Sequence, residues 1–135
     1  MAALTKVGTP SVASLLPPAN NKICDIVAGE ALGAWDACYI KGSDGKAYKS
    51  TGAAANAAAV VDGFAAKADA IGAPVTLFYD VEVQYATGMT PGTNYYLSGT
   101  TAGGLDTSTS TGGTHPVARA KTATVLLVRR VWEVG

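Results

Sequence analysis

The chain has 135 residues, a length that suits one domain with a single core. Nearly half of the residues are hydrophobic (48%) and only 15% are charged, so the surface suits burial against a partner. The formal net charge is zero, which argues against a nucleic-acid binder that depends on neutralising phosphates. No run reaches the roughly 18 apolar residues of a membrane helix, and the N-terminus lacks a signal-peptide pattern. We therefore expect a protein made and used in a cytoplasm, or in a particle assembled there.

Residues 1–22 contain three prolines, scattered small residues and no acidic residue. Proline disfavours a helix, and no alternation of apolar and polar residues supports a strand. Two interpretations stay open: a disordered terminus, or an extended arm that becomes ordered along a neighbouring subunit. In the second interpretation the residues that make the contact are Val7, Pro10, Val12, Leu15, Leu16 and Pro17. The chain then divides into an arm, residues 1–22, and a β-rich domain, residues 23–135.

The pattern of residues 23–40 predicts a strand, a turn and a second strand. The pattern of residues 37–50 predicts a β-hairpin that begins with this second strand. Asp44-Gly45 would supply the two positive-φ positions of a type I′ turn. Cys24 and Cys38 lie in apolar surroundings without metal-ligand spacing, so we expect buried free thiols.

Residues 52–72 are ambiguous because the density of alanine favours a helix, whereas Val60-Val61 and Gly63 favour a strand. A helical turn near residues 53–59 followed by a strand is one solution. Residues 75–79 then form a strong strand that continues loosely to Tyr85.

Residues 87–104 read as turn, strand and turn. Thr90-Pro91-Gly92-Thr93 predicts a type II turn, with proline and glycine at the positions whose φ values they favour, and residues 94–97 form the strand. Residues 105–113, LDTSTSTGG, predict an exposed polar loop, which could bind a sugar but contains no aromatic ring for stacking.

Two further strands are expected at residues 117–120 and 124–131. The early part of the second is apolar on both faces, which places it between two layers or against another subunit. The sequence thus predicts an all-β protein, a small single-domain β-barrel or β-sandwich built from hairpins, with at most one short helix.

Groups that could carry chemistry are few. His115 is the only histidine and has no evident partner, and the acidic residues are spread singly along the chain. Asp80 and Glu82 share one strand face, but two carboxylates bind calcium weakly. We therefore expect no catalytic residue, no metal site and no cofactor, and the protein is not predicted to be an enzyme.

Basic residues gather near the C-terminus, at Arg119, Lys121, Arg129 and Arg130. They indicate either a solvated strand face or a patch that meets an acidic protein surface. The residues that we expect at a contact between subunits are Tyr95, Tyr96, Arg129, Arg130 and Trp132.

Two blocks of the sequence resemble known phage proteins. AGEALGAWDACYIKGSDGKAYKSTGAAANAAAVVDGFAAKADAIGAPVTLF resembles the pattern AGEAL-x-x-GD-x-VYI-x-DGK-x-Y-x-A … GF-A … G-x-PV-x-V of phage capsid decoration (cement) proteins. TPGTNYYLSGTTAGGLDTSTSTGGTHPVARAKTATVLLV resembles a TPG-x-x-YYLS … GG … T-x-LLV segment of small phage structural proteins. Together they cover roughly residues 27–128. The chain departs from the pattern at Trp35, where glycine is usual before Asp36, and the resemblance implies a strand at residues 60–68.

The resemblance implies a phage head decoration (cement) protein that binds the outer surface of the expanded capsid at capsomer junctions and stabilises it. Its partners would be the major capsid protein and copies of itself, as a trimer on the shell, with no nucleic acid and no membrane. It would be made in the host cytoplasm and located in the virion, on the outer capsid surface. The alternative is a head- or tail-fibre binding module that contacts a host glycan, through residues 106–113, or another fibre protein.

Overall fold

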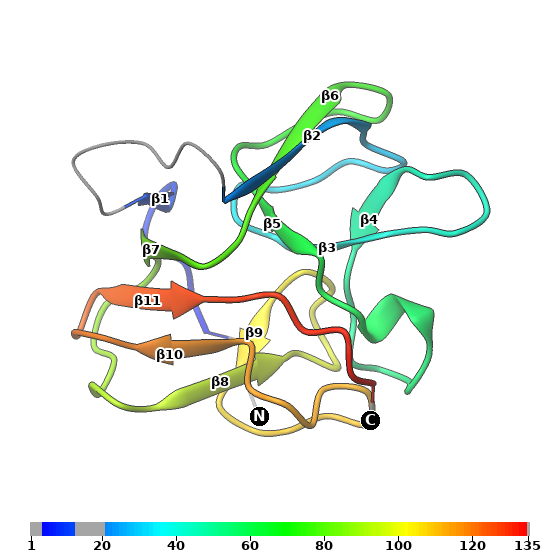
Figure 1. The fold of residues 1–135 in the computed structure, drawn as a ribbon. Helices are drawn as coiled ribbons and strands as arrows, with labels where there is room; N and C mark the ends of the chain where they lie inside the picture. Colours follow the sequence, from blue (N-terminus) through cyan, green and yellow to red (C-terminus); the bar gives the residue numbers. More distant parts are fainter. Residues whose placement is uncertain (1–3, 13–20, 135) are drawn as a thin grey trace.

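The computed structural model describes residues 4–12 and 21–134, and in this part of the chain two antiparallel β-sheets carry the fold without an α-helix (Figure 1). The all-β prediction is therefore confirmed. The two sheets do not close into a single barrel. One isolated bridge, between Val61 and Val131, joins the segment just before β5 (Gly63–Ala65) of the five-stranded sheet to the chain that follows β11 (Val125–Val128) of the six-stranded sheet.

The first sheet has six strands in the order β1-β7-β11-β10-β8-β9. Their bounds are Ser11–Val12 for β1, Val81–Gln84 for β7, Val125–Val128 for β11, Ala118–Ala120 for β10, Asn94–Leu97 for β8 and Leu105–Asp106 for β9. Apolar side chains alternate along the central strands, so that Val83, Leu126 and Tyr95 face the core. The opposite face is open to solvent.

The second sheet has five strands in the order β2-β6-β5-β3-β4. Their bounds are Lys22–Val27 for β2, Pro74–Phe78 for β6, Gly63–Ala65 for β5, Ala37–Ile40 for β3 and Ala47–Lys49 for β4. The edge strand β2 contains a bulge, where the register shifts between Ile23 and Ile26 and Asp25 adopts φ +61. A bulge of this kind disrupts the ladder that a further strand would extend.

Both faces of the five-stranded sheet are buried, at least in part. Ala37 and Phe64 face the main core, which they share with the inner face of the six-stranded sheet. Their neighbours along the chain, Cys38 and Ala65, point the other way into a smaller cluster with Leu77. The strands therefore lack a simple polar and apolar alternation, which is why the pattern in this half of the sequence is only loose.

The hairpin expected at residues 37–50 is confirmed by the pairing of β3 with β4, in which Tyr39 lies opposite Tyr48. The prediction of a type I′ turn in this hairpin is wrong. The chain makes a longer loop over residues 41–46, in which the Gly45 N–H donates to Lys41 O over 2.8 Å and only Gly45 has a positive φ, +70. The Asp44 carboxylate accepts hydrogen bonds from the Lys46 N–H and the Tyr48 hydroxyl, which hold Asp44 in an ordinary conformation.

The ambiguous segment resolves into a 3-10 turn, η1 (Ala57–Ala59), and the short strand β5. The Asn56 side chain caps η1 by accepting from the Ala58 N–H, so a helical turn is present but covers only the last three of the expected residues 53–59. Of the strand expected at residues 60–68, only residues 63–65 form β5, and Val61 pairs with Val131 instead.

Strands β6 and β7 do not form the continuous run that the sequence suggested. Asp80 adopts φ +52 between them, and the two strands belong to different sheets. The type II turn is confirmed: the Thr93 N–H donates to Thr90 O over 3.1 Å and Gly92 has φ +85. Strand β8 follows it with the expected bounds.

The described part of the arm packs on the domain itself. The Leu4 N–H donates to Leu105 O and the Val7 N–H to Tyr85 O, over 2.7 and 2.8 Å, and β1 pairs with β7 at the edge of the six-stranded sheet. The Lys6 ammonium lies 2.6 Å from an Asp36 carboxylate oxygen. Residues 4–12 are therefore part of the folded unit.

Candidate functional site

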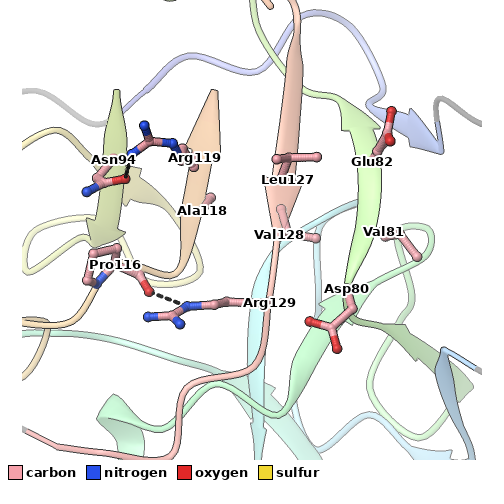
Figure 2. A pocket seen from close by; sticks show the side chains of 10 residues that line it. All are labelled: Asp80, Val81, Glu82, Asn94, Pro116, Ala118, Arg119, Leu127, Val128 and Arg129. Atoms are coloured by element: carbon pink, nitrogen blue, oxygen red, sulfur yellow. Dashed lines mark hydrogen bonds between the residues drawn. The ribbon is translucent and has the colours of Figure 1, made fainter. Parts of the chain in front are cut away.

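A hollow lined by charged side chains lies on the solvent face of the six-stranded sheet, and Figure 2 shows the residues that line it. Four side chains form a row across neighbouring strands because their residues pair directly in register: Glu82, Leu127, Arg119 and Asn94. The hollow has a volume of about 520 Å³. Its lining is completed by Asp80, Val81, Pro116, Ala118, Val128 and Arg129. We call this hollow the arginine groove.

Two arginines form one wall of the arginine groove. Arg119 donates from Nη1 to Asn94 Oδ1 over 3.0 Å, and Arg129 donates from Nε to Pro116 O over 2.8 Å. Each guanidinium is thus oriented by one hydrogen bond to a neutral acceptor. Figure 2 shows both side chains directed toward β8 and Pro116, whereas Asp80 and Glu82 lie on the other side of β11.

Within the described ranges, every ion pair uses a lysine. Lys6 pairs with Asp36, Lys67 with Asp69 and Lys121 with Glu82. No carboxylate of the described residues lies within salt-bridge distance of Arg119 or Arg129. Among the basic residues near the C-terminus, Lys121 is therefore paired with a carboxylate. Arg119 and Arg129 keep N–H groups that can donate hydrogen bonds to a ligand.

Arg130 and Trp132 form a second surface feature, near the seam between the sheets. The Arg130 guanidinium lies 3.8 Å from the centroid of the Tyr79 ring and 4.8 Å from that of Trp132. The Trp132 indole N–H donates to Asp62 Oδ1 over 3.0 Å, yet Trp132 is 59% exposed. A large aromatic side chain held in place and exposed is typical of an interface anchor.

The predicted arm residues have different environments. Pro10 is buried, Val7 is 44% exposed and Val12 lies in β1. Leu15, Leu16 and Pro17 lie outside the described residues.

The remaining predicted subunit-contact residues also divide. Tyr95 is 3% exposed and points into the core, so its side chain does not reach the surface in this fold. Tyr96, its neighbour on β8, is half-buried, Arg129 is exposed and Arg130 is half-buried. Arg129, Arg130 and Trp132 therefore offer surface for a contact and Tyr95 does not.

The polar loop of residues 105–113 is not a free loop tip. Gly112 and Gly113 are buried, and the Gly112 N–H donates to Gly52 O over 2.9 Å. The Ser110 hydroxyl donates to Leu97 O over 2.7 Å, and Asp106 is buried. Only Thr107, Thr109 and Thr111 of this loop are exposed, so most of the predicted sugar-binding loop is packed.

The cysteines and the histidine differ in exposure. Cys38 is buried, as expected, and burial, with the nearby Asp36 charge, raises the pKa of its thiol to about 12. Cys24 is exposed, so its predicted burial is wrong; it lies beside the β2 bulge at Asp25. His115 is exposed, with Nδ1 3.4 Å from the Thr114 hydroxyl oxygen.

Within residues 4–12 and 21–134, no three His, Cys, Asp or Glu side chains gather closely enough to hold a metal ion. None of the described segments forms an apolar helix of membrane-spanning length.

Comparisons with protein-family models, with curated proteins and with solved structures find no match to this chain.

Sequence reasoning identified Arg119 and Arg129 as basic residues but did not place them together on a groove. Both positions alternate with apolar residues, which predicts that the two side chains are exposed but does not predict the groove. Sequence reasoning missed Asn94, Pro116 and Leu127, whose roles depend on the pairing of β10 with its neighbour in the sequence, β11, and with β8, which lies farther away along the chain.

Proposed function

We propose that this protein is a phage head decoration (cement) protein, which binds the outer surface of the expanded capsid at capsomer junctions and stabilises it. The observation that carries the proposal is the order of the two sequence blocks that resemble such proteins, from AGEAL to PVTLF and from TPG to LLV. Its partners are the major capsid protein and neighbouring copies, with a trimer as the proposed state on the shell.

The physical basis is preferential binding. A protein that binds the expanded shell but not the unexpanded one shifts the equilibrium toward the expanded shell. Each contact can be modest, because the symmetry of the shell repeats it and simultaneous contacts add avidity.

Exposed apolar side chains support a protein that works by contact. Trp132, Leu127 and Val7 are each at least 40% exposed, so they offer apolar surface that a partner could cover. We propose Trp132, with Arg130 stacked on it, as the main anchor of a contact with the shell or with a neighbouring copy.

The arm is tested by substitution and not by deletion, because residues 4–12 pack on the domain and their removal would damage the fold. Replacing Leu15 and Leu16 by serine leaves those contacts intact. If the arm supplies much of the shell contact, this double variant binds heads more weakly while its thermal unfolding temperature stays that of the wild type.

The proposal is tested by heating undecorated expanded heads of the source phage with increasing concentrations of the protein. We expect the temperature of head disruption, followed by light scattering, to rise and then reach a plateau when all sites are filled. Trp132→Ala should weaken binding about tenfold or more, whereas Ile71→Ala, which removes another exposed apolar side chain, should not. Heads that are disrupted at one temperature at every protein concentration would contradict the proposal.

The fibre-module alternative gains support from one observation, the exposed indole of Trp132, since sugar sites stack an aromatic ring. Glycan-array binding that Trp132→Ala abolishes, together with no effect on heads, would favour that alternative.

A further inference from the structure

The arginine groove has the features of a binding site for carboxylates. Arg119 and Arg129 each present a planar guanidinium with five N–H groups, of which one is used within the described residues. Guanidinium groups bind carboxylates through paired hydrogen bonds, which gives both strength and orientation. A bond to a neutral acceptor fixes each side chain, so little further ordering is needed when an anion arrives.

The spacing of the two arginines matches an extended peptide. Arg119 pairs with Leu127 across the strands. Arg129 lies one residue past the end of β11 and stays aligned with the neighbouring chain, because its N–H donates to Val117 O over 3.0 Å. Such diagonal neighbours lie roughly 7–8 Å apart. In an extended chain, side chains at positions i and i+2 point to one face and lie about 6.6–6.8 Å apart. Two acidic residues separated by one residue would therefore reach both guanidinium groups.

The chemistry of the lining favours a peptide over a nucleic acid. Leu127, which is 40% exposed, and Pro116 provide apolar surface beside the arginines. Asp80 and Glu82 lie on the opposite side of the groove (Figure 2). Glu82 is paired with Lys121, whereas Asp80 is exposed and has no ion pair within the described part of the chain. A nucleic acid carries a negative charge on every nucleotide, so the Asp80 carboxylate would repel one of its phosphates. A peptide with only two carboxylates can place both on the arginines and leave neutral residues near Asp80.

We propose that the arginine groove binds an extended acidic segment of a partner protein, with the pattern acidic, apolar, acidic, one carboxylate on Arg119 and the other on Arg129. The apolar residue between them turns away from the sheet. This inference does not depend on the identity of the partner as a capsid protein.

The experiment measures the fluorescence anisotropy of a labelled, end-blocked peptide, Gly-Glu-Val-Glu-Val-Gly, with the full chain at low salt. We expect saturable binding, and a Kd raised about tenfold or more by Arg119→Gln and by Arg129→Gln. Lys46→Gln removes the same charge from the exposed loop between β3 and β4 and should leave the Kd unchanged. Asp80→Asn should tighten binding, because it removes the unpaired carboxylate of the groove.

Two further probes make the result specific. The peptide Gly-Glu-Glu-Val-Val-Gly has the same composition but places its two acidic side chains on opposite faces of an extended chain, and should bind more weakly. Arg129→Lys keeps the charge but loses the guanidinium fork, so partial loss of affinity supports paired hydrogen bonding. The thermal unfolding temperature of each variant confirms that it is folded.

The proposal is overturned if the wild-type chain does not bind the peptide at millimolar concentration, or if Lys46→Gln weakens binding as much as the groove variants. It is also overturned if single-stranded DNA binds more tightly than the peptide and loses affinity in Arg119→Gln, because the groove would then be a phosphate site.

Discussion

Trp35 shows how one side chain can hold the backbone in a conformation that its residue type disfavours. Its φ is +60, in the left-handed region that glycine adopts readily, and the resembled pattern usually has glycine at this position. The indole is 2% exposed and stacks on the Phe78 ring with 5.7 Å between the ring centroids. Burial of the large ring compensates for the strain in the backbone, so the turn before Asp36 keeps the conformation of a glycine turn.

We predict that Trp35→Ala lowers the free energy of unfolding by about 3–5 kcal/mol, because it removes a buried aromatic side chain. Trp35→Gly should lower it by about 1 kcal/mol less, since glycine relieves the strain at positive φ. At most positions a substitution by glycine destabilises a protein more than a substitution by alanine. A glycine variant that is more stable than the alanine variant would therefore indicate backbone strain at residue 35. Urea denaturation of the two variants measures the difference, and a less stable glycine variant would contradict the proposed strain.

Cys38 makes stability depend on pH in the alkaline range. Burial raises the pKa of its thiol from 9.0 to about 12, and burial together with the Asp36 charge also raises the pKa of the Tyr85 phenol. Above pH 9 the unfolded chain releases the thiol proton while the folded chain keeps it, so the unfolded state binds fewer protons and the free energy of unfolding falls as pH rises.

We predict a loss of stability between pH 9 and 11, to which Cys38 contributes a slope of roughly 1 kcal/mol per pH unit. Cys38→Ala should make the slope shallower by that amount, whereas Cys24→Ala, at an exposed position, should leave it unchanged. Denaturation curves at several pH values in reducing buffer give the slopes. Equal slopes in the wild type and in Cys38→Ala would show that the buried thiol does not titrate on unfolding.

At the scale of elements, local chemistry determined what the sequence could predict. The turn at residues 90–93 and strand β8 follow from proline and glycine at their own positions, and both are confirmed. The break at Asp80 and the packed loop at residues 105–113 depend on contacts with segments far away in the sequence. For the same reason the arginine groove could not be predicted, although its two arginines could.

The packed loop at residues 105–113 depends on glycine where it meets residues 52–54. A Cβ atom on Gly112 would lie 2.3 Å from Ala54 O and 2.7 Å from Ala59 Cβ, both well inside van der Waals contact. A polar, glycine-containing run can therefore be a packed element, and its composition alone does not distinguish this from an exposed loop.

We predict that Gly112→Ala lowers the free energy of unfolding by about 1–3 kcal/mol, because the loop must move to accept the methyl group. Gly42→Ala is the matched control, since a Cβ there meets nothing within 4 Å and its φ is not positive. We expect no loss of stability for the control. Thermal unfolding of both variants tests the packing, and equal stability of the two would indicate that the loop is loosely held.

At the scale of the whole molecule, the two sheets share one main core and leave separate surfaces for partners. The solvent face of the six-stranded sheet carries the arginine groove (Figure 2), and the chain after β11 presents the exposed Trp132 near the seam, where it bonds to Asp62. A protein that joins capsomers needs more than one contact surface, because it must bind the shell and neighbouring copies together. The arrangement supports the proposed function without requiring any catalytic group.

The most direct measurement is co-sedimentation of the purified protein with undecorated heads of the source phage, with expanded and unexpanded heads compared side by side. We predict saturable binding to expanded heads alone, with a fixed number of copies per capsomer at saturation and in groups of three if the trimer forms. Absence of binding to either kind of head, or equal binding to both, would contradict a role in stabilising the expanded shell.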